Sequence, residues 1–423
     1  MSASVPGQPP ALLRQLRLLD AVGIGFGAII GAGIFVVTGV AATMAGPALV
    51  VALLLAALAA TLNALSSAEL AARFPQSGGT YEYGYQLLGP WRGFAAGWMF
   101  LASKMAAAGV VAIGLGAYAT MLVPGINPRA LAVVAVVAFT ALNYFGIQRT
   151  SRLNLLIVGM SITSLLLLVI LGAASFRPAN FHPFAPGGLA GIMEAAAILF
   201  FAYTGYARIA TLGEEVRDPR HTIPRAIIIT ILSSAALYMA VAAVAIGVVG
   251  ADRIAGNPAP LGVAALAAGG PALATIIAVG AVTAMLGVIL SQIIGMSRMA
   301  FAMARRSDLP APLAAVHPRY GVPHRAVLLV GLGAAVIAAT GTLRGVAAAA
   351  SFAILVYYFI ANWAALRLVP ADRLYPQAVP LLGFIICALL AVSLDLRVIL
   401  TGIGVLTAGL LARTVVLWRR RQR

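Results

Sequence analysis

The sequence predicts an all-α membrane protein, and three observations lead to that prediction. Hydrophobic residues make up 62% of the 423 residues, charged residues only 9%, and the mean hydropathy is +1.01. A soluble chain of this length needs far more charge to cover its surface. Apolar stretches long enough to cross a hydrocarbon core of about 30 Å recur from one end of the chain to the other. The lipid bilayer is therefore expected to surround most of the protein.

About twelve membrane-spanning helices are expected, because each apolar stretch is close to the length of one crossing. Their approximate ranges are 19–44, 47–71, 94–123, 129–147, 153–174, 189–213, 225–250, 271–304, 325–342, 345–369, 378–394 and 396–418. The residues before and after them, 1–18 and 419–423, are expected to be cytoplasmic tails. The polar, proline-rich start lacks the apolar centre of a signal peptide.

The arginines predict the orientation of these spans. With the N-terminus placed in the cytoplasm, 21 arginines fall at cytoplasmic ends and loops. The opposite side holds five, namely Arg129, Arg177, Arg253, Arg344 and Arg397. This is the bias that positive-inside insertion produces. The net charge of +17 is therefore interpreted as a topology signal and not as a nucleic-acid footprint. A multi-pass protein of the plasma (inner) membrane is expected, with both termini cytoplasmic.

Few residues could carry metal or catalytic chemistry. The chain has one cysteine, Cys387, and four histidines, so an internal disulfide is impossible and a metal cluster is not expected. No H-x-E, C-x-x-C, phosphate-loop or nucleophile-elbow motif occurs. We therefore expect no enzyme activity and no cofactor. Without an ATP-binding loop, any transport must be driven by gradients or by exchange.

Glycines at the centres of the first and sixth spans predict two broken helices. The first centre is Ile29–Phe35, which contains Gly31 and Gly33, and the second is Phe200–Tyr206, which contains Gly205. Close helix packing is the alternative for one glycine-rich helix, but a matching break five spans later favours unwinding. This spacing is expected of a five-plus-five inverted repeat. The repeats would be residues 19–175 and 189–369, followed by two further spans in 378–418.

An unwound helix inside a membrane places bare peptide groups beside a cavity. The N–H groups at one half-helix end suit a carboxylate, and the carbonyls at the other end suit an ammonium group or a cation. Two facing breaks therefore predict a site for the zwitterionic head of an α-amino acid. The predicted substrate-binding residues of the two breaks are Ile30, Gly31, Ala32, Gly33, Phe201, Ala202, Thr204 and Gly205.

Several motifs in register resemble the amino acid–polyamine–organocation (APC) superfamily. Ile29–Phe35 is similar to its first-helix signature, and Phe200–Arg225 to its sixth helix and the loop that follows. Phe74–Tyr81, Arg298–Pro310 and Val316–Pro323 resemble further family motifs after the second and eighth spans. Together they cover spans one to nine in order. The resemblance is closest to the cationic amino acid transporter branch and its bacterial relatives.

The resemblance implies a LeuT-type fold, with helices 1 and 6 unwound at mid-membrane, and secondary amino acid transport by alternating access. It also implies that Thr283 and Met285 of the eighth span line the pocket. Glu214 and Glu215 are similar to residues that cap the inner end of the sixth span. Ala207 stands where the branch usually has an acidic residue, which argues against lysine or arginine as the substrate.

Lys104, in the third span, is the only lysine among 28 basic residues. An ionisable residue inside a span is costly and therefore indicates function, and a lysine can lose its proton when it is desolvated. Proton-coupled relatives carry a lysine in span five, where this chain has Ser161. We therefore hypothesise that Lys104 replaces that lysine as the coupling cation. Snorkelling to the cytoplasmic interface is the structural alternative.

Arg208 lies about one turn beyond the sixth-span break. It could hold an acidic side chain or form a gate with Glu69, although pairing with the Glu214–Glu215 loop is the favoured interpretation. The sequence thus predicts proton-coupled uptake of neutral or broad-range L-amino acids, with small or medium apolar substrates preferred. Exchange without ion coupling, transport of cationic amino acids and a non-transporting amino acid sensor remain alternatives.

Overall fold

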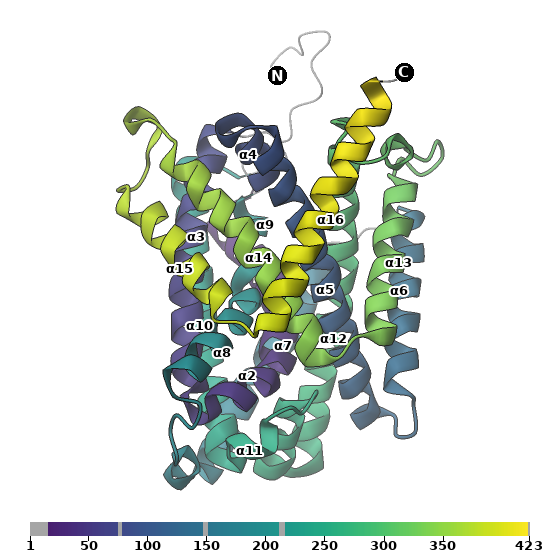
Figure 1. The fold of residues 1–423 in the computed structure, drawn as a ribbon. Coiled ribbons are helices and arrows are strands. Elements are labelled where there is room, and N and C mark those ends of the chain that lie inside the picture. The colour runs from purple at the N-terminus through teal and green to yellow at the C-terminus, as the bar shows by residue number, and fades with distance from the viewer. Residues whose placement is uncertain (1–15, 75–77, 147–150, 211–215, 422–423) are drawn as a thin grey trace.

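The computed structural model describes residues 16–74, 78–146, 151–210 and 216–421. The described residues form helices and turns, with one isolated bridge between Leu16 and Val216 and no sheet. Figure 1 shows a bundle of long helices, with α4 and the C-terminal end of α16 at one end and α11 at the other. The expected all-helical class is confirmed.

The helices follow in a single order along the chain. The α-helices are α1 (Leu18–Ile29), α2 (Thr38–Ala45), α3 (Leu49–Arg73), α4 (Thr80–Leu88), α5 (Pro90–Leu122), α6 (Pro128–Tyr144), α7 (Ser151–Gly172), α8 (Gly188–Tyr203), α9 (Ala207–Ala210), α10 (Pro219–Val249), α11 (Ala251–Ile254), α12 (Pro260–Arg305), α13 (His324–Thr340), α14 (Leu343–Leu366), α15 (Ala378–Val392) and α16 (Leu396–Arg421). Shorter elements are the π-helix η1 (Gly33–Val37) and the 3₁₀ turns η2 (Gly46–Ala48), η3 (Ala173–Ser175), η4 (Pro178–Phe181), η5 (Thr204–Tyr206), η6 (Ala311–Ala314) and η7 (Pro370–Asp372).

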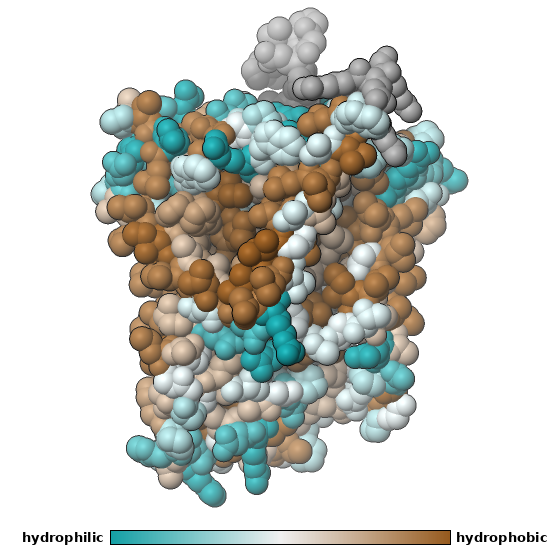
Figure 2. Space-filling view, in the orientation of Figure 1, coloured by the Kyte–Doolittle hydropathy of each residue, from teal (hydrophilic) through white to brown (hydrophobic). Residues whose placement is uncertain are grey.

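Eight helical segments of the described chain are long and apolar enough to cross a membrane. One of them, Leu18–Arg73, has 56 residues, which is roughly twice the length of one crossing. A turn at Gly46, where φ is +56°, divides it. Three shorter apolar helices, α6, α13 and α15, add to these. In Figure 2 hydrophobic residues dominate the upper and middle part of the face, and hydrophilic residues gather at both ends and in one central patch.

The long helix α12 is two helices joined at a kink. Gly269 and Gly270 have non-helical backbone angles, and φ of Gly270 is +66°. Pro271 follows and suits the first turn of the next helix because its missing N–H would have no partner there. A second helix therefore begins at Pro271, where the sequence analysis starts its eighth span, and the point at which the chain enters the membrane stays a prediction.

Small residues let the spans approach closely. A Cβ added to Gly331 of α13 would lie 2.3 Å from the Thr140 side chain of α6, closer than real side chains come. Close backbone approach of this kind is what holds helices together in lipid, where burial of apolar surface gives no advantage. On the outside, large apolar residues such as Leu332, Val392 and Leu400 are exposed by 59–68%, as expected of surfaces that face lipid.

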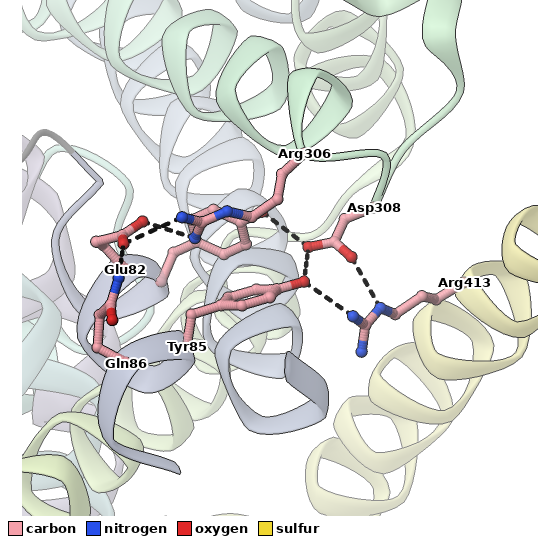
Figure 3. A network of polar contacts seen from close by, with 7 residues as sticks. Glu82, Tyr85, Gln86, Arg306, Asp308 and Arg413 are labelled. Atoms are coloured by element: carbon pink, nitrogen blue, oxygen red, sulfur yellow. Dashed lines mark hydrogen bonds and ion pairs between the residues drawn. The ribbon is translucent and has the colours of Figure 1, made fainter. Parts of the chain in front are cut away.

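A polar network joins α4 to the end of α12 (Figure 3). Arg306 donates two hydrogen bonds to the Glu82 carboxylate, at 2.6 and 3.1 Å, and Gln86 donates a third at 2.8 Å. Burial alone would raise the pKa of Glu82, but the hydrogen bonds from Arg306 and Gln86 outweigh it and the pKa is lowered. The carboxylate is therefore held in its charged form.

The same network reaches α16 through Asp308 (Figure 3). Tyr81 donates to Asp308 Oδ2 at 2.8 Å, Tyr85 donates to the same oxygen, and Arg413 Nε donates to Oδ1 at 2.8 Å. Arg413 also lies over the Trp91 ring, 4.5 Å from its centroid. Burial and the bond to Asp308 raise the pKa of the Tyr85 hydroxyl, so it stays protonated and donates. Asp308 thus ties three separate helical segments together.

Candidate functional site

The first span breaks directly after α1. Ile30 has a ψ of +110°, an extended conformation, and the chain resumes as η1 and then α2. The N–H of Ile30 donates to Phe26 O at 2.8 Å, and the next backbone bond runs from Phe35 N to Gly31 O at 3.3 Å. Among the described residues, no backbone acceptor is found for the N–H groups of Gly31, Ala32 and Gly33. Bare peptide donors thus lie within the span.

The sixth span is tightened but not opened. α8 ends at Tyr203, and the turn η5 leads into α9. Both the N–H and the Oγ1 of Thr204 donate to Phe201 O, the latter at 2.9 Å. The full unwinding predicted for Phe201–Gly205 is therefore wrong for this structure. Its physical reason is that the i→i+3 bonds of a 3₁₀ turn replace the missing i→i+4 bonds.

The two altered segments lie against each other. A Cβ added to Gly205 would lie 2.2 Å from Ala28 O, and a Cβ added to Gly33 would lie 2.4 Å from the Ala202 Cβ. Real side chains do not come this close, so only glycine permits the contact at either position. The structure therefore brings the two predicted glycine segments together, as a facing pair requires.

The helix α12 covers the first break from a third side. A Cβ on Gly31 would lie 2.9 Å from Val288 Cγ2, and Met285 Sδ lies 3.2 Å from the Cβ position of Gly114. Met285 is fully buried. Thr283 donates to Val279 O and Gly280 O of its own helix, so its role as a pocket wall stays a prediction. Sequence reasoning missed Val288, although it lies three residues from Met285 and so on the same helix face.

Lys104 reaches the sixth span. Its Nζ lies 3.4 Å from Thr204 Oγ1 and 5.8 Å from the centroid of the Phe100 ring. No ion pair with an acidic residue holds it within the described part of the chain. The side chain therefore points to the altered turn η5 instead of snorkelling to an end of α5. Its role in coupling stays a prediction.

Ser161 faces a different neighbour. It is buried in α7 and donates to Ile157 O at 2.8 Å and to Gly280 O of α12 at 3.2 Å. It thus joins α7 to the helix that covers the first break. Ser161 and Lys104 therefore contact different segments: Ser161 contacts Gly280 of α12, and Lys104 contacts Thr204 of η5.

Tyrosines that sequence reasoning missed satisfy backbone groups around the first break. Tyr238 of α10 donates to Ile29 O at 2.9 Å, and Tyr118 of α5 donates to Phe35 O at 2.6 Å. The Tyr203 hydroxyl is buried with no partner among the described residues, and its ring lies 5.4 Å from that of Tyr238. The sequence carried little signal for them, because aromatic residues in spans mostly serve packing.

The predicted gating residues lie toward the end that carries α4. Glu69 is buried, and its Oε1 accepts from Leu374 N at 2.9 Å, which fixes the loop before α15. Arg208 is exposed on α9, and its side chain is not without an interaction partner. A gate between Glu69 and Arg208 stays a prediction. Glu214 and Glu215 lie outside the described residues.

At the opposite side of the break, α8 and α14 are joined. Arg344 lies 3.3 Å from Glu194, and Ser351 Oγ donates to Ile198 O at 3.0 Å.

Ile30 and Phe201 are at most 8% exposed, so the site is closed to solvent in this conformation. In the described part of the chain, no group of three or more His, Cys, Asp or Glu could hold a metal ion.

Many apolar helices, with one span broken inside the bundle next to a second altered span, define the architecture of a secondary transporter. Comparison with known proteins gives the family. Residues 20–415 match the amino acid permease family, so the chain belongs to that family. It is thus a multi-pass membrane protein from a family of transporters and not of enzymes. The resemblance to the APC superfamily is confirmed.

The names of individual relatives refer to different substrates or to none. An uncharacterized transporter of Mycobacterium tuberculosis is 45% identical over 419 residues, covering 98% of this chain and 94% of the relative. A branched-chain amino acid permease of Bacillus subtilis is 35% identical over 347 residues, covering 77% and 75%. A methylthioribose transporter of the same species is 36% identical over 355 residues, covering 79% and 77%. The similarity extends to plant cationic amino acid transporters, as the sequence motifs suggested.

Proposed function

We propose that the protein is a secondary active transporter that takes up neutral or broad-range L-amino acids by alternating access, coupled to protons. Its fold would be the LeuT-type inverted repeat, with residues 19–175 and 189–369 as the repeats and 378–418 as two further spans. The divided segment Leu18–Arg73, the other long apolar helices and the three shorter ones are compatible with twelve crossings. Both termini would be cytoplasmic, as the arginine distribution predicts.

One observation carries this proposal. The N–H groups of Gly31, Ala32 and Gly33 have no backbone acceptor among the described residues. Gly33 abuts Ala202 of the sixth span, and Gly205 abuts Ala28 just before the break. Peptide donors at the start of a helix bind carboxylates well, and in a buried site they lose no hydrogen bonds to water when the ligand arrives. An amino acid carboxylate at Gly31–Gly33 would give these donors the acceptors that the described residues do not provide.

The pocket side chains favour a neutral substrate. Ile30, Met285 and Val288 supply apolar surface, and none of them offers a counter-charge to a basic side chain. The relative named as a branched-chain amino acid permease supports such a substrate, whereas the methylthioribose transporter makes a neutral sulfur-containing sugar the second candidate. A screen must therefore include both.

Lys104 would couple protons to the movement of the sixth span. It donates to Thr204, and Thr204 donates to Phe201 O inside the turn η5. A lysine that loses its proton changes from a cation to a neutral amine, which weakens its hydrogen bond to Thr204. Proton release at Lys104 would thereby alter the turn that packs on the substrate site.

Proteoliposome uptake tests the proposal. Labelled leucine, alanine, lysine and methylthioribose are compared with and without an inward proton gradient, in the wild type, Lys104→Met and Lys104→Arg. Leucine or alanine uptake should be accelerated by the gradient in the wild type only, whereas counterflow without a gradient survives in both variants. Gradient-driven uptake that persists in Lys104→Met removes the coupling role. Uptake of lysine or methylthioribose alone removes the substrate assignment.

A further inference from the structure

A small polar pocket lies apart from the substrate site, near the end of the bundle where Arg306 meets α4. It has a volume of about 100 Å³ and opens between the end of α6, the second half of α12 and the turn before α13. Its lining includes Asn143, Ser297, Arg298, Gly321, Pro323 and Val327. Neither the proposed transport cycle nor the polar network of Figure 3 uses it.

Within the described part of the chain, the positive charge at this pocket has no protein partner. Arg298 is exposed and makes no hydrogen bond or ion pair with another residue of the described chain. The lining contains no carboxylate. Asp308, the acid nearest in sequence, is bound to Arg413 and the tyrosines of α4. An anion could therefore bind at Arg298 without competing with a protein carboxylate.

Backbone donors lie beside the same pocket. α13 starts at His324, with Pro323 as its N-cap, and its first intrahelical bond is from Val327 N to Pro323 O. The N–H groups of Arg325 and Ala326 have no backbone acceptor in the described residues. The start of this 17-residue helix lies beside the pocket, whose lining includes Pro323 and Val327. Its dipole favours a negative charge there. The Nδ1 of the adjacent His324 is buried and has no hydrogen-bond partner among the described residues.

We propose that this pocket binds a phosphate group, held between the Arg298 guanidinium and the first turn of α13. The volume of the pocket corresponds to about three water molecules, which suits the oxygens of one phosphate. Two sources share this chemistry, the headgroup of an anionic phospholipid and soluble phosphate. The pocket lies at the end of spanning helices and has Ile294 and Val327 in its lining, which favours the lipid.

Thermal unfolding of the purified protein in detergent tests this binding independently of transport. Phosphatidylglycerol, phosphatidylcholine and inorganic phosphate are titrated, the last against chloride of equal ionic strength. Arg298→Gln is compared with Arg305→Gln, which removes an equal charge from the exposed end of the same helix outside the pocket lining. Arg298→Lys, which retains the charge without the planar guanidinium, serves as a second variant if the glutamine variant folds poorly.

Phosphatidylglycerol should raise the unfolding temperature and phosphatidylcholine should not. Arg298→Gln should raise the half-saturating lipid concentration at least tenfold, Arg298→Lys by less, and Arg305→Gln should leave it unchanged. Stabilisation by inorganic phosphate that equals that of the lipid assigns the site to soluble phosphate. Equal stabilisation by both lipids, or equal losses in the Arg298 and Arg305 glutamine variants, would overturn the proposal.

Discussion

Removing the charge of Asp308 should destabilise the protein strongly, because its partner Arg413 is buried. The two side chains are only 2% and 5% exposed, and their atoms lie 2.8 Å apart. Removing one partner of a buried ion pair costs about 3–5 kcal/mol, since the other charge stays out of water without compensation. In Asp308→Asn the hydroxyls of Tyr81 and Tyr85 can still donate to the amide oxygen, so we expect the lower value, about 3 kcal/mol.

The matched control is an ion pair that faces solvent. Arg344 and Glu194 are 59% and 21% exposed, and Glu194→Gln should cost about 0–1 kcal/mol because water screens such pairs. The free energy of unfolding is measured by titration with a denaturing detergent. Tryptophan fluorescence follows the unfolding, and one of the four tryptophans, Trp91, has its ring 4.5 Å from the Arg413 guanidinium.

A double variant separates charge burial from general damage. Asp308→Leu combined with Arg413→Met removes both charges, and should be more stable than either single variant because no charge is left unpaired. The reasoning fails if Asp308→Asn costs no more than Glu194→Gln. It also fails if the effects of the two single changes simply add in the double variant.

Two further predictions concern single hydrogen bonds. Tyr238→Phe removes the hydroxyl that donates to Ile29 O beside the first break. The lost hydrogen bond is worth about 0.5–1.5 kcal/mol, so substrate binding should weaken roughly two- to tenfold. Transport kinetics should show a higher KM and an unchanged kcat. An unchanged KM would mean that this carbonyl does not shape the site. Glu82→Gln tests pH dependence: a carboxylate with a lowered pKa contributes stability above its unfolded pKa of about 4.3, and loses it as the pH falls further. Unfolding temperatures between pH 3 and 7 should therefore vary less in the variant, and an identical acid profile would contradict this.

Membrane helices were predictable because lipid imposes one strong rule. Every peptide group inside hydrocarbon needs a partner, so long apolar stretches must be helical. The sequence analysis also started its eighth span at Pro271, where the second helix of α12 begins, since proline suits the first turn of a helix. In contrast, the network of Asp308 and Arg413 joins residues 105 positions apart. Nothing in local periodicity links them, and the sequence analysis counted Arg413 only for orientation and gave Asp308 no role of its own.

The two altered helix segments were predicted in their location but not in their geometry. A glycine in the middle of a span is compatible with an extended break, with a left-handed residue or with a close contact. In the first span the break is real, because Ile30 is extended. In the sixth span the backbone stays helical, and φ of Gly205 is not positive. Gly205 is there because Ala28 leaves no room for a side chain, which requires knowledge of the neighbouring helix.

This difference makes Gly205→Ala a decisive test of how the two segments work together. The added Cβ would lie 2.2 Å from Ala28 O, so η5 must move away from α1, at a cost of about 1–3 kcal/mol for overpacking. Gly159→Ala is the control, because a Cβ on this α7 glycine meets no atom within 4 Å.

If the contact only holds helices together, Gly205→Ala lowers the unfolding temperature but folded protein transports with an unchanged KM. If the contact positions the bare N–H groups of Gly31–Gly33 for a carboxylate, KM rises as well, whereas Gly159→Ala changes neither quantity. We expect the second result, because moving η5 also displaces Ala202 from Gly33 and so disturbs the donors themselves. An unchanged KM at a lowered unfolding temperature would leave the sixth span a packing element and the carboxylate site to the first span alone.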